Sequence, residues 1–253
     1  MSVHPLALPS SVAARPDLTG GRRVGVLLSH GFTGSPVSVR PWGDALAERG
    51  YAVEVPRLPG HGTTWQEMNR TRWEDWYEHL ERVLERLVDE NDAVVVGGLS
   101  MGGGLALRLA AAHAGRVAGV VLVNPAVTST NRQLLAAPLL QHAVGSVAAI
   151  GNDIAKPGAD ERAYPRTPLR ALVSMTRGWK DVRDHLGEVT APVLLFRSAQ
   201  DHVVDPSSAA LIRSRVGDVT ERVLEDSFHV ATLDHDAQRI FDETAEFVAR
   251  VTA

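Results

Sequence analysis

The chain has 253 residues, of which 44% are hydrophobic and 22% are charged, and its formal net charge at pH 7 is −4. These values lie near globular averages and exclude a disordered or fibrous chain, and an acidic chain without a basic stripe is not expected to bind nucleic acid. Because there is no cysteine, disulfides, thiolate metal sites and a cysteine nucleophile are all excluded. The length fits one large α/β domain.

The first 20 residues carry several prolines but no basic segment followed by a continuous apolar stretch. They are therefore not expected to form a signal peptide. No other segment approaches the roughly 20 consecutive apolar residues that a membrane span needs. These observations predict a cytoplasmic protein.

Strand-like and helix-like segments alternate along most of the chain, which is typical of a parallel sheet with crossover helices. The strand-like segments are short apolar runs that end at turn residues, and the helix-like segments carry apolar residues at helical spacing. The predicted strands are 24–29, 52–55, 93–97, 117–123, 193–198 and 222–224. The predicted helices are 42–49, 73–88, 101–113, 207–215 and 235–251.

The alternation stops between residues 126 and 177, where we find no convincing strand and where prolines separate apolar, helix-like pieces. A structureless loop of this length is unusual within a compact domain. We therefore expect a small helical cap at 126–177, inserted into an α/β core formed by residues 1–125 and 178–253.

Residues 98–102 read Gly-Leu-Ser-Met-Gly and lie between a predicted strand and a predicted helix. In that context the Gly-x-Ser-x-Gly pattern predicts a sharp turn that presents Ser100 as a nucleophile. Bulk at Gly98 or Gly102 would clash across the turn, and the start of the following helix offers free N–H groups to an oxyanion.

Two other readings of this glycine-rich turn are disfavoured. A phosphate-binding loop needs a lysine after its last glycine, but residues 102–105 read Gly-Gly-Gly-Leu, and Ser100 interrupts the spacing of a dinucleotide-binding turn. An epoxide hydrolase or a haloalkane dehalogenase needs a carboxylate where Ser100 stands.

A serine nucleophile needs a histidine base and a carboxylate that orients it, in the chain order serine, acid, histidine. Asp201 directly follows the predicted strand 193–198, whereas Asp205 precedes a proline and resembles a turn residue. Position relative to the strand end favours Asp201 as the acid.

For the base, His229 follows the last predicted strand and precedes the terminal helix. His235 stands at the start of that helix, where a capping or solvated role is the simpler interpretation. His202 is adjacent to the predicted acid and is poorly placed to be oriented by it. The order of the elements therefore favours His229.

An oxyanion hole needs two backbone donors. The N–H of Met101, the residue after the nucleophile, is one candidate. The loop 30–34, which reads His-Gly-Phe-Thr-Gly after the first core strand, offers the N–H of Phe32 as the other.

Taken together, these motifs resemble the bacterial monoacylglycerol lipases and the related thermostable carboxylesterases, which have the α/β-hydrolase fold. The similar stretches are HGFTGS at 30–35, LPGHG at 58–62, GLSMGG at 98–103, DHVV at 201–204 and HVATLD at 229–234. In the predicted cap, IGNDI at 150–154 and AYPRTP at 163–168 look like the monoacylglycerol lipases rather than the carboxylesterases.

The resemblance implies Ser100 as nucleophile, Asp201 as acid, His229 as base, and the Phe32 and Met101 amides as oxyanion donors. It implies two-step acyl transfer, in which glycerol leaves an acyl-enzyme that water then hydrolyses. No metal and no organic cofactor is expected.

In the cap, the resemblance implies that Ile150 narrows the substrate pocket and that Glu161 lies near the glycerol hydroxyls. An isoleucine at helical spacing is equally consistent with core packing, and Glu161 with a solvated charge. The apolar cap stretch 134–149 could roof an acyl-chain pocket, pack on the core, or contact a lipid surface transiently at the membrane periphery.

The expected substrate is thus a monoacylglycerol or a similar small lipid ester. A general carboxylesterase, an acyltransferase with the same triad and a non-catalytic ligand-binding relative, like the hormone receptors of this fold, stay open as alternatives. A homodimer stays open beside a monomer.

Overall fold

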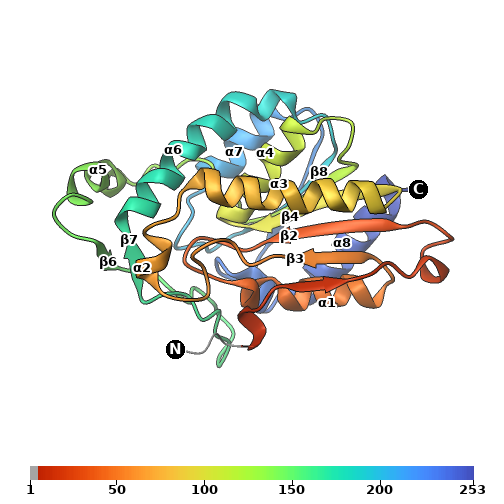
Figure 1. The fold of residues 1–253 in the computed structure, drawn as a ribbon, viewed down its shortest axis with the longest axis horizontal. Helices are drawn as coiled ribbons and strands as arrows, with labels where there is room; N and C mark the ends of the chain where they lie inside the picture. The colour runs from red at the N-terminus through yellow and green to blue at the C-terminus, as the bar shows by residue number, and fades with distance from the viewer. Residues whose placement is uncertain (1–4) are drawn as a thin grey trace.

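A computed structural model describes residues 5–253, and its main element is a mixed sheet (Figure 1). Within this range the sheet has seven strands in the order β1-β3-β2-β4-β5-β8-β9. All neighbours are parallel except β1, which runs antiparallel to β3 along one edge. The strands are β1 (Ser10–Val12), β2 (Val24–Ser29), β3 (Ala52–Val55), β4 (Ala93–Leu99), β5 (Gly119–Val123), β8 (Val193–Ser198) and β9 (Val219–Leu224).

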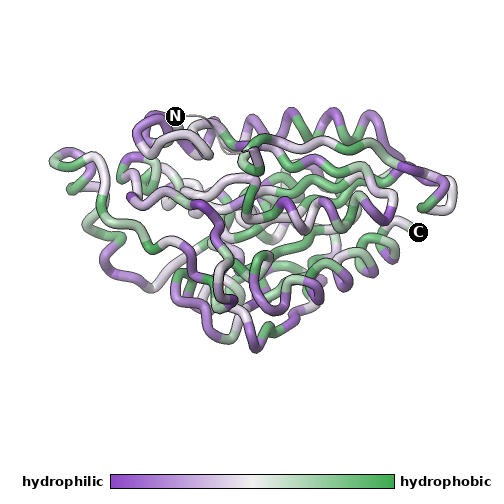
Figure 2. The backbone as a smooth tube through the Cα atoms, turned by 90° about the horizontal axis from the view of Figure 1, so that it is seen from below, coloured by the Kyte–Doolittle hydropathy of each residue, from purple (hydrophilic) through white to green (hydrophobic). Residues whose placement is uncertain are grey.

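Helices cover both faces of this sheet, which confirms the predicted α/β architecture. One apolar layer joins the sheet to α1 (Arg40–Glu48) and α8 (Ala237–Val251). The other layer joins it to α3 (Trp73–Glu90), α4 (Met101–Ala112), α6 (Leu169–His185) and α7 (Ser207–Arg215). Figure 2 shows hydrophobic residues concentrated along the strands between these helices.

The side-chain alternation of the strands explains the two layers. In β2, Leu27 belongs to the layer under α3 and α4, while Val26 and Leu28 belong to the layer under α1 and α8. Since both faces are buried, the strand reads as a continuous apolar run rather than as an alternation. The aromatic stripe predicted at 73–88 is packing: Trp73 and Trp76 are buried in the core.

The N-terminal residues run along the edge of the sheet. They form two short 3₁₀ helices, Pro5–Ala7 and Pro16–Leu18, on either side of β1. The expectation that residues 1–20 do not form a signal peptide stays a prediction, and residues 1–4 of that segment lie outside the described residues. Strand β1 is absent from the sequence prediction because three residues, two of them exposed, give no periodic pattern.

We call residues 126–168, between β5 and α6, the insertion. It holds a 3₁₀ helix (Arg132–Ala136), α5 (Ala137–Leu140) and an antiparallel pair, β6 (Ser146–Ala148) with β7 (Arg166–Pro168). The expectation of helical pieces without strands is therefore wrong for β6 and β7, which at three residues each are too short to show a strand pattern. Figure 1 shows α5 and β6 projecting beyond one end of the sheet.

Helix α6 crosses the boundary expected at residue 177. It contacts α3, α4 and α5 together, and its buried Ala171, Met175 and Trp179 join the main core. The division into an α/β core and a cap stays a prediction, and α6 lies between the two parts.

Candidate active site

Ser100 occupies the sharp turn between β4 and α4. Its backbone has φ 57° and ψ −118°, in the positive-φ range that side chains other than glycine seldom adopt. The turn is fixed by the bond from the Ser100 N–H to the Val123 carbonyl at 2.9 Å, and the Ser100 carbonyl accepts from the N–H of Ala126 at 3.0 Å. The neighbouring strand β5 and the start of the insertion thus hold the strained residue in place.

Glycine is required on both sides of this turn for steric reasons. A Cβ at Gly98 would lie 2.3 Å from the carbonyl carbon of Gly102, which is the clash across the turn that the sequence predicts. A Cβ at Gly102 would lie 2.2 Å from the carbonyl oxygen of Ser29 at the end of β2. The second clash is with a neighbouring strand, which a local motif does not reveal.

Asp201 and His229 form a buried hydrogen-bonded pair. Their atoms Oδ2 and Nδ1 lie 2.8 Å apart, and because an ionised carboxylate only accepts, the Nδ1–H of His229 is the donor. The other oxygen of Asp201 accepts from the N–H groups of Val203 and Val204, both at 2.8 Å. The carboxylate is therefore held from both sides, with its free rotation removed.

The pKa of His229 is raised above its ordinary value of 6.5. Burial alone would disfavour the imidazolium ion, but the hydrogen bond and the negative charge of Asp201 outweigh it, with smaller contributions from Glu161 and Asp153. A base with a raised pKa binds its proton more strongly.

The competing residues make different contacts. Asp205 accepts from the N–H groups of Thr130 at 2.8 Å and Ser207 at 3.0 Å, and these bonds outweigh burial and lower its pKa to about 2. His235 is exposed, and the Nδ1 of His202 lies 2.8 Å from Asp153. Among the described residues, no hydrogen bond joins Asp205 to a histidine.

Ser100 and His229 both line a cavity of about 680 Å³. The loop after β2 contributes Gly31, Phe32 and Thr33, and a Cβ at Gly31 would stand 3.3 Å from that of Ser100. The wall is mostly apolar and comes largely from the insertion and α6: Leu134, Ala136, Ala137, Leu140, Val147, Ala148, Ile150, Leu169, Leu172, Met175 and Trp179.

The predicted oxyanion donors flank Ser100. Met101 is the first residue of α4, where backbone N–H groups have no partner within the helix. Phe32 belongs to the cavity wall, and the following residue Thr33 has φ 60° and donates its hydroxyl to the Phe32 carbonyl at 2.6 Å. The structure thus brings both residues to the nucleophile turn.

Both residues expected in the cap also line the cavity. Ile150 is 68% exposed, so it is not a core residue. Glu161 accepts from the N–H of Asn152 at 3.0 Å, and Asn152 accepts in return from the N–H of Glu161 at 2.9 Å. Burial raises the pKa of Glu161, so it is not a freely solvated charge either.

Sequence reasoning missed two aspartates that connect the insertion to the His229 loop. Asp153 accepts from the N–H of His229 at 3.1 Å. Asp234 is buried and accepts from the N–H groups of Ala155 at 2.7 Å, Lys156 at 2.8 Å and Phe228 at 2.9 Å. The HVATLD stretch contains Asp234, but nothing in its pattern indicates contacts with residues some 80 positions earlier.

The LPGHG stretch packs against the loop after β2 through two buried histidines. The Nε2 of His30 accepts from the N–H of Leu58 at 3.2 Å, and the rings of His30 and His61 are 4.9 Å apart. Burial lowers the pKa of His30 to about 4 and that of His61 well below its ordinary value. Both rings are therefore neutral, and the bond between His30 and Leu58 joins the loop after β2 to the LPGHG stretch.

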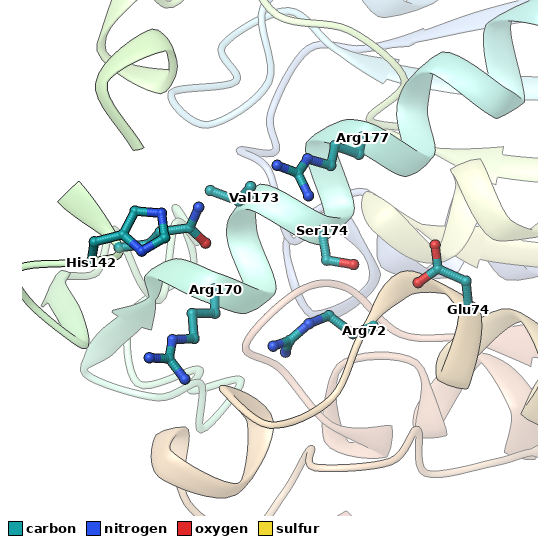
Figure 3. Close-up of a pocket in the computed structure, with 8 residues that line it drawn as sticks. Arg72, Glu74, His142, Arg170, Val173, Ser174 and Arg177 are labelled. Carbon is teal, nitrogen blue, oxygen red and sulfur yellow. The ribbon is translucent and has the colours of Figure 1, made fainter. Parts of the chain in front are cut away.

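A second hollow of about 350 Å³ lies between α3, α6 and the turn after α5 (Figure 3). Arg72, Arg170 and Arg177 contribute to its lining together with His142. None of the predicted catalytic residues lines it. Among residues 5–253, no grouping of histidine and acidic side chains suits a metal ion, and no helix is both long and apolar enough for a bilayer.

Comparison with known proteins gives consistent similarities. The family model Hydrolase_4 (serine aminopeptidase, S33) matches residues 21–236. A thermostable monoacylglycerol lipase of Bacillus sp. (strain H-257) is 37% identical over 246 residues, covering 96% of this chain and 97% of that protein. A carboxylesterase of Bacillus subtilis (strain 168) is 27% identical over 243 residues, covering 95% and 98%.

Among solved structures, one from a study of the metagenome-derived lipolytic enzymes LipS and LipT superposes with a TM-score of 0.92. It is 35% identical in sequence, and the alignment covers 98% of this chain and 100% of that chain. The similarity therefore includes the insertion as well as the sheet.

Proposed function

Because the chain belongs to the Hydrolase_4 (serine aminopeptidase, S33) family and is a serine ester hydrolase of the α/β-hydrolase fold, we propose that it cleaves monoacylglycerols to glycerol and a fatty acid. One observation carries the proposal: Ser100 and His229, which is bonded to the buried Asp201, line the same cavity of about 680 Å³, whose wall is mainly apolar. Such a cavity fits an acyl chain.

In the proposed mechanism, His229 accepts the proton of the Ser100 hydroxyl as its oxygen attacks the ester carbonyl carbon. Asp201 holds the imidazole in the tautomer whose Nε2 is free and stabilises the imidazolium that forms. The N–H groups of Phe32 and Met101 bind the oxyanion of the tetrahedral intermediate.

The intermediate then collapses to an acyl-enzyme as His229 gives its proton to the departing glycerol oxygen. Water enters, His229 takes one of its protons, and the resulting hydroxide attacks the acyl carbon. Return of the proton to Ser100 releases the fatty acid. Neither a metal nor an organic cofactor takes part in this scheme.

Two residues of the insertion support a glycerol ester over a bulkier one. Glu161 is held at the cavity wall by its reciprocal bonds with Asn152, where a carboxylate can accept from glycerol hydroxyls. Ile150 stands in the same wall, and in this proposal it narrows the cavity where the glycerol group binds. The 37% identity with a monoacylglycerol lipase agrees with this substrate class.

The insertion also supports a transient contact with a lipid surface. Leu135 and Leu139 are 77% and 79% exposed, yet neither lines the cavity. They project from a segment at the end of the sheet, where an apolar surface can enter the outer part of a bilayer. In this proposal residues 126–168 act as a cap that receives the substrate from lipid. The cytoplasmic location and a homodimer stay predictions.

The decisive experiment compares turnover of monoacylglycerols, diacylglycerols, triacylglycerols and simple alkyl esters of one chain length. We expect kcat/KM for the monoacylglycerol to exceed that for the alkyl ester by about ten-fold, the value of one or two added hydrogen bonds. Equal values would identify a general carboxylesterase, the activity named for the 27% identical relative.

Ser100→Ala serves as the control and should lower kcat by at least about 10⁴-fold while the circular dichroism spectrum stays unchanged. Residual turnover near the wild-type value would remove Ser100 from the mechanism. Product partition with an added alcohol acceptor separates hydrolysis from acyl transfer. Binding without any turnover by the wild-type protein would favour the ligand-binding alternative.

A further inference from the structure

Asp153, a residue of the insertion, forms hydrogen bonds with both loops that carry the predicted catalytic pair. Its Oδ2 accepts from two backbone N–H groups, those of His202 at 3.2 Å and His229 at 3.1 Å. Its Oδ1 lies 2.8 Å from the Nδ1 of His202, and its own carbonyl accepts from the N–H of Val230 at 3.0 Å. One residue of the insertion therefore binds both loops that carry the Asp201–His229 pair.

These two loops come from different strands and have no covalent link near the site. The loop after β8 carries Asp201 and His202, and the loop after β9 carries Phe228 and His229. Besides the bond within the catalytic pair, the rings of His202 and Phe228 meet edge to face at 4.6 Å. The carboxylate of Asp153 fixes the same two loops from the cavity side, with its side chain only 12% exposed.

The position of Asp153 is itself fixed by the chain that follows it. Asp234, from the His229 loop, accepts from the N–H groups of Ala155 and Lys156 through its two oxygens. The stretch 153–156 is thus bound at both ends to the loop that holds the histidine. A displacement of this part of the insertion would pull directly on the backbone of His229.

We propose that Asp153 is a positioning residue for His229. Through Asp153, the position of the insertion on the two loops determines the orientation and the proton affinity of the catalytic base. The expected effect of Asp153 on kcat rests on the proposed function, whereas its expected effect on the His229 titration does not. No covalent step is assigned to Asp153.

The groups that face His229 set the size of the effect. Asp201 comes from the loop after β8, and Glu161 and Asp153 come from the insertion; the charges of all three favour the imidazolium ion. The His202 ring, whose Nδ1 lies 2.8 Å from the Asp153 carboxylate, is the neighbouring titratable group. Removing the charge of Asp153 leaves Asp201 and Glu161 in place, so a partial effect is expected.

Asp153→Asn separates charge from position. The amide oxygen can accept from both backbone N–H groups, and the amide nitrogen can donate to the Nδ1 of His202, so the geometry is kept while the charge is lost. In a Ser100→Ala background, NMR titration should show the pKa of His229 lower by about half a unit or more than with Asp153 present. This measurement does not depend on the protein being an esterase.

Asp153→Ala removes position as well. In the protein with Ser100 intact, we expect kcat for a soluble ester to fall about ten-fold or more with KM changed by less than about three-fold, because a misplaced base slows the chemistry and not the binding. At pH values above the acid limb of its pH profile, Asp153→Asn should keep kcat within about three-fold of the wild-type value. The acid limb itself should move to lower pH.

Asp205→Asn is the matched control. Asp205 lies in the loop after β8 and its carboxylate joins that loop to Thr130 at the beginning of the insertion, but among the described residues it forms no hydrogen bond with Asp201, His202 or His229. It should leave the His229 titration unmoved. The proposal is overturned if the His229 titration in Asp153→Asn is not shifted. It is also overturned if Asp153→Asn and Asp153→Ala lose kcat equally and the acid limb of the pH profile does not move. If Asp153→Ala does not fold, the titration of Asp153→Asn decides alone.

Discussion

His30 and His61 illustrate at the residue scale how the fold imposes a protonation state. Both imidazoles are completely buried near the loop after β2, where the Nδ1 of His30 lies 3.0 Å from the Gly31 carbonyl and the Nδ1 of His61 lies 3.0 Å from the Pro59 carbonyl. Burial penalises the charged form, so both rings stay neutral in the folded chain at a pH where an exposed histidine takes up a proton. A pH dependence of stability follows.

We expect the free energy of unfolding to decrease as the pH falls from 6.5 towards 4. Below pH 6.5 the unfolded chain binds protons at His30 and His61 that the folded chain does not bind. The free energy of unfolding therefore decreases by up to about 1.4 kcal/mol per pH unit for each histidine. For His30 the loss stops near pH 4, where the folded chain also takes up its proton. His229, whose pKa is raised, acts oppositely: its contribution is complete below 6.5 and disappears at higher pH.

Urea unfolding at half-unit steps between pH 7 and 4 measures this slope. His61→Gln removes one titrating ring and should reduce the slope by about one proton. A free energy of unfolding that stays constant between pH 6.5 and 5 would contradict the assignment of neutral, buried imidazoles.

At the element scale, the turn between β4 and α4 depends on close backbone contacts. We predict that Gly102→Ala destabilises the protein by about 3 kcal/mol or more and abolishes esterase activity, since its Cβ would overlap the Ser29 carbonyl and displace Ser100. Gly187→Ala is the matched control, because its Cβ would meet nothing within 4 Å and its stability should change by less than about 1 kcal/mol. Thermal unfolding and ester turnover check both; wild-type stability in Gly102→Ala would refute the packing argument.

The elements differ in how far the sequence predicts them. Strands such as β2 and β8 and the long helix α3 are found at or near their predicted bounds, because buried runs and helical spacing are local signals. Strands β1, β6 and β7 are not predicted, since each has three residues and depends on pairing with distant chain. Likewise the order of the elements along the chain predicts Asp201 and His229. Asp153 is not predicted, because its contact with His229 depends on the three-dimensional path of an irregular segment.

At the scale of the whole molecule, the insertion projects beyond one end of the sheet at α5 and β6 (Figure 1) and carries the exposed Leu135 and Leu139. We predict that the double variant Leu135→Ser, Leu139→Ser hydrolyses a monoacylglycerol in lipid vesicles about five-fold more slowly, because it loses apolar surface that would enter the bilayer. Hydrolysis of a soluble short-chain ester should stay within about two-fold of wild type, since neither leucine lines the cavity.

Leu18→Ser provides the comparison, because Leu18 is also an exposed leucine, at 51%, but lies in the 3₁₀ helix after β1. It should leave vesicle hydrolysis unchanged. Equal losses on both substrates for the insertion variant would show that the leucines act on the folded state or on the chemistry rather than on contact with lipid.

The strand β1 has a further consequence for the whole molecule. Its residues Ser10–Val12 cover the edge of β3, which would otherwise present unpaired N–H and C=O groups. The opposite edge, β9, carries Glu221 and Arg222, and Glu221 is engaged by Arg197 and Arg213. One edge is thus shielded by a strand and the other by charge. Removing the N-terminal residues through Val12 would leave the edge of β3 with unpaired backbone groups and favour aggregation, although none of residues 5–12 lines the cavity that contains Ser100 and His229.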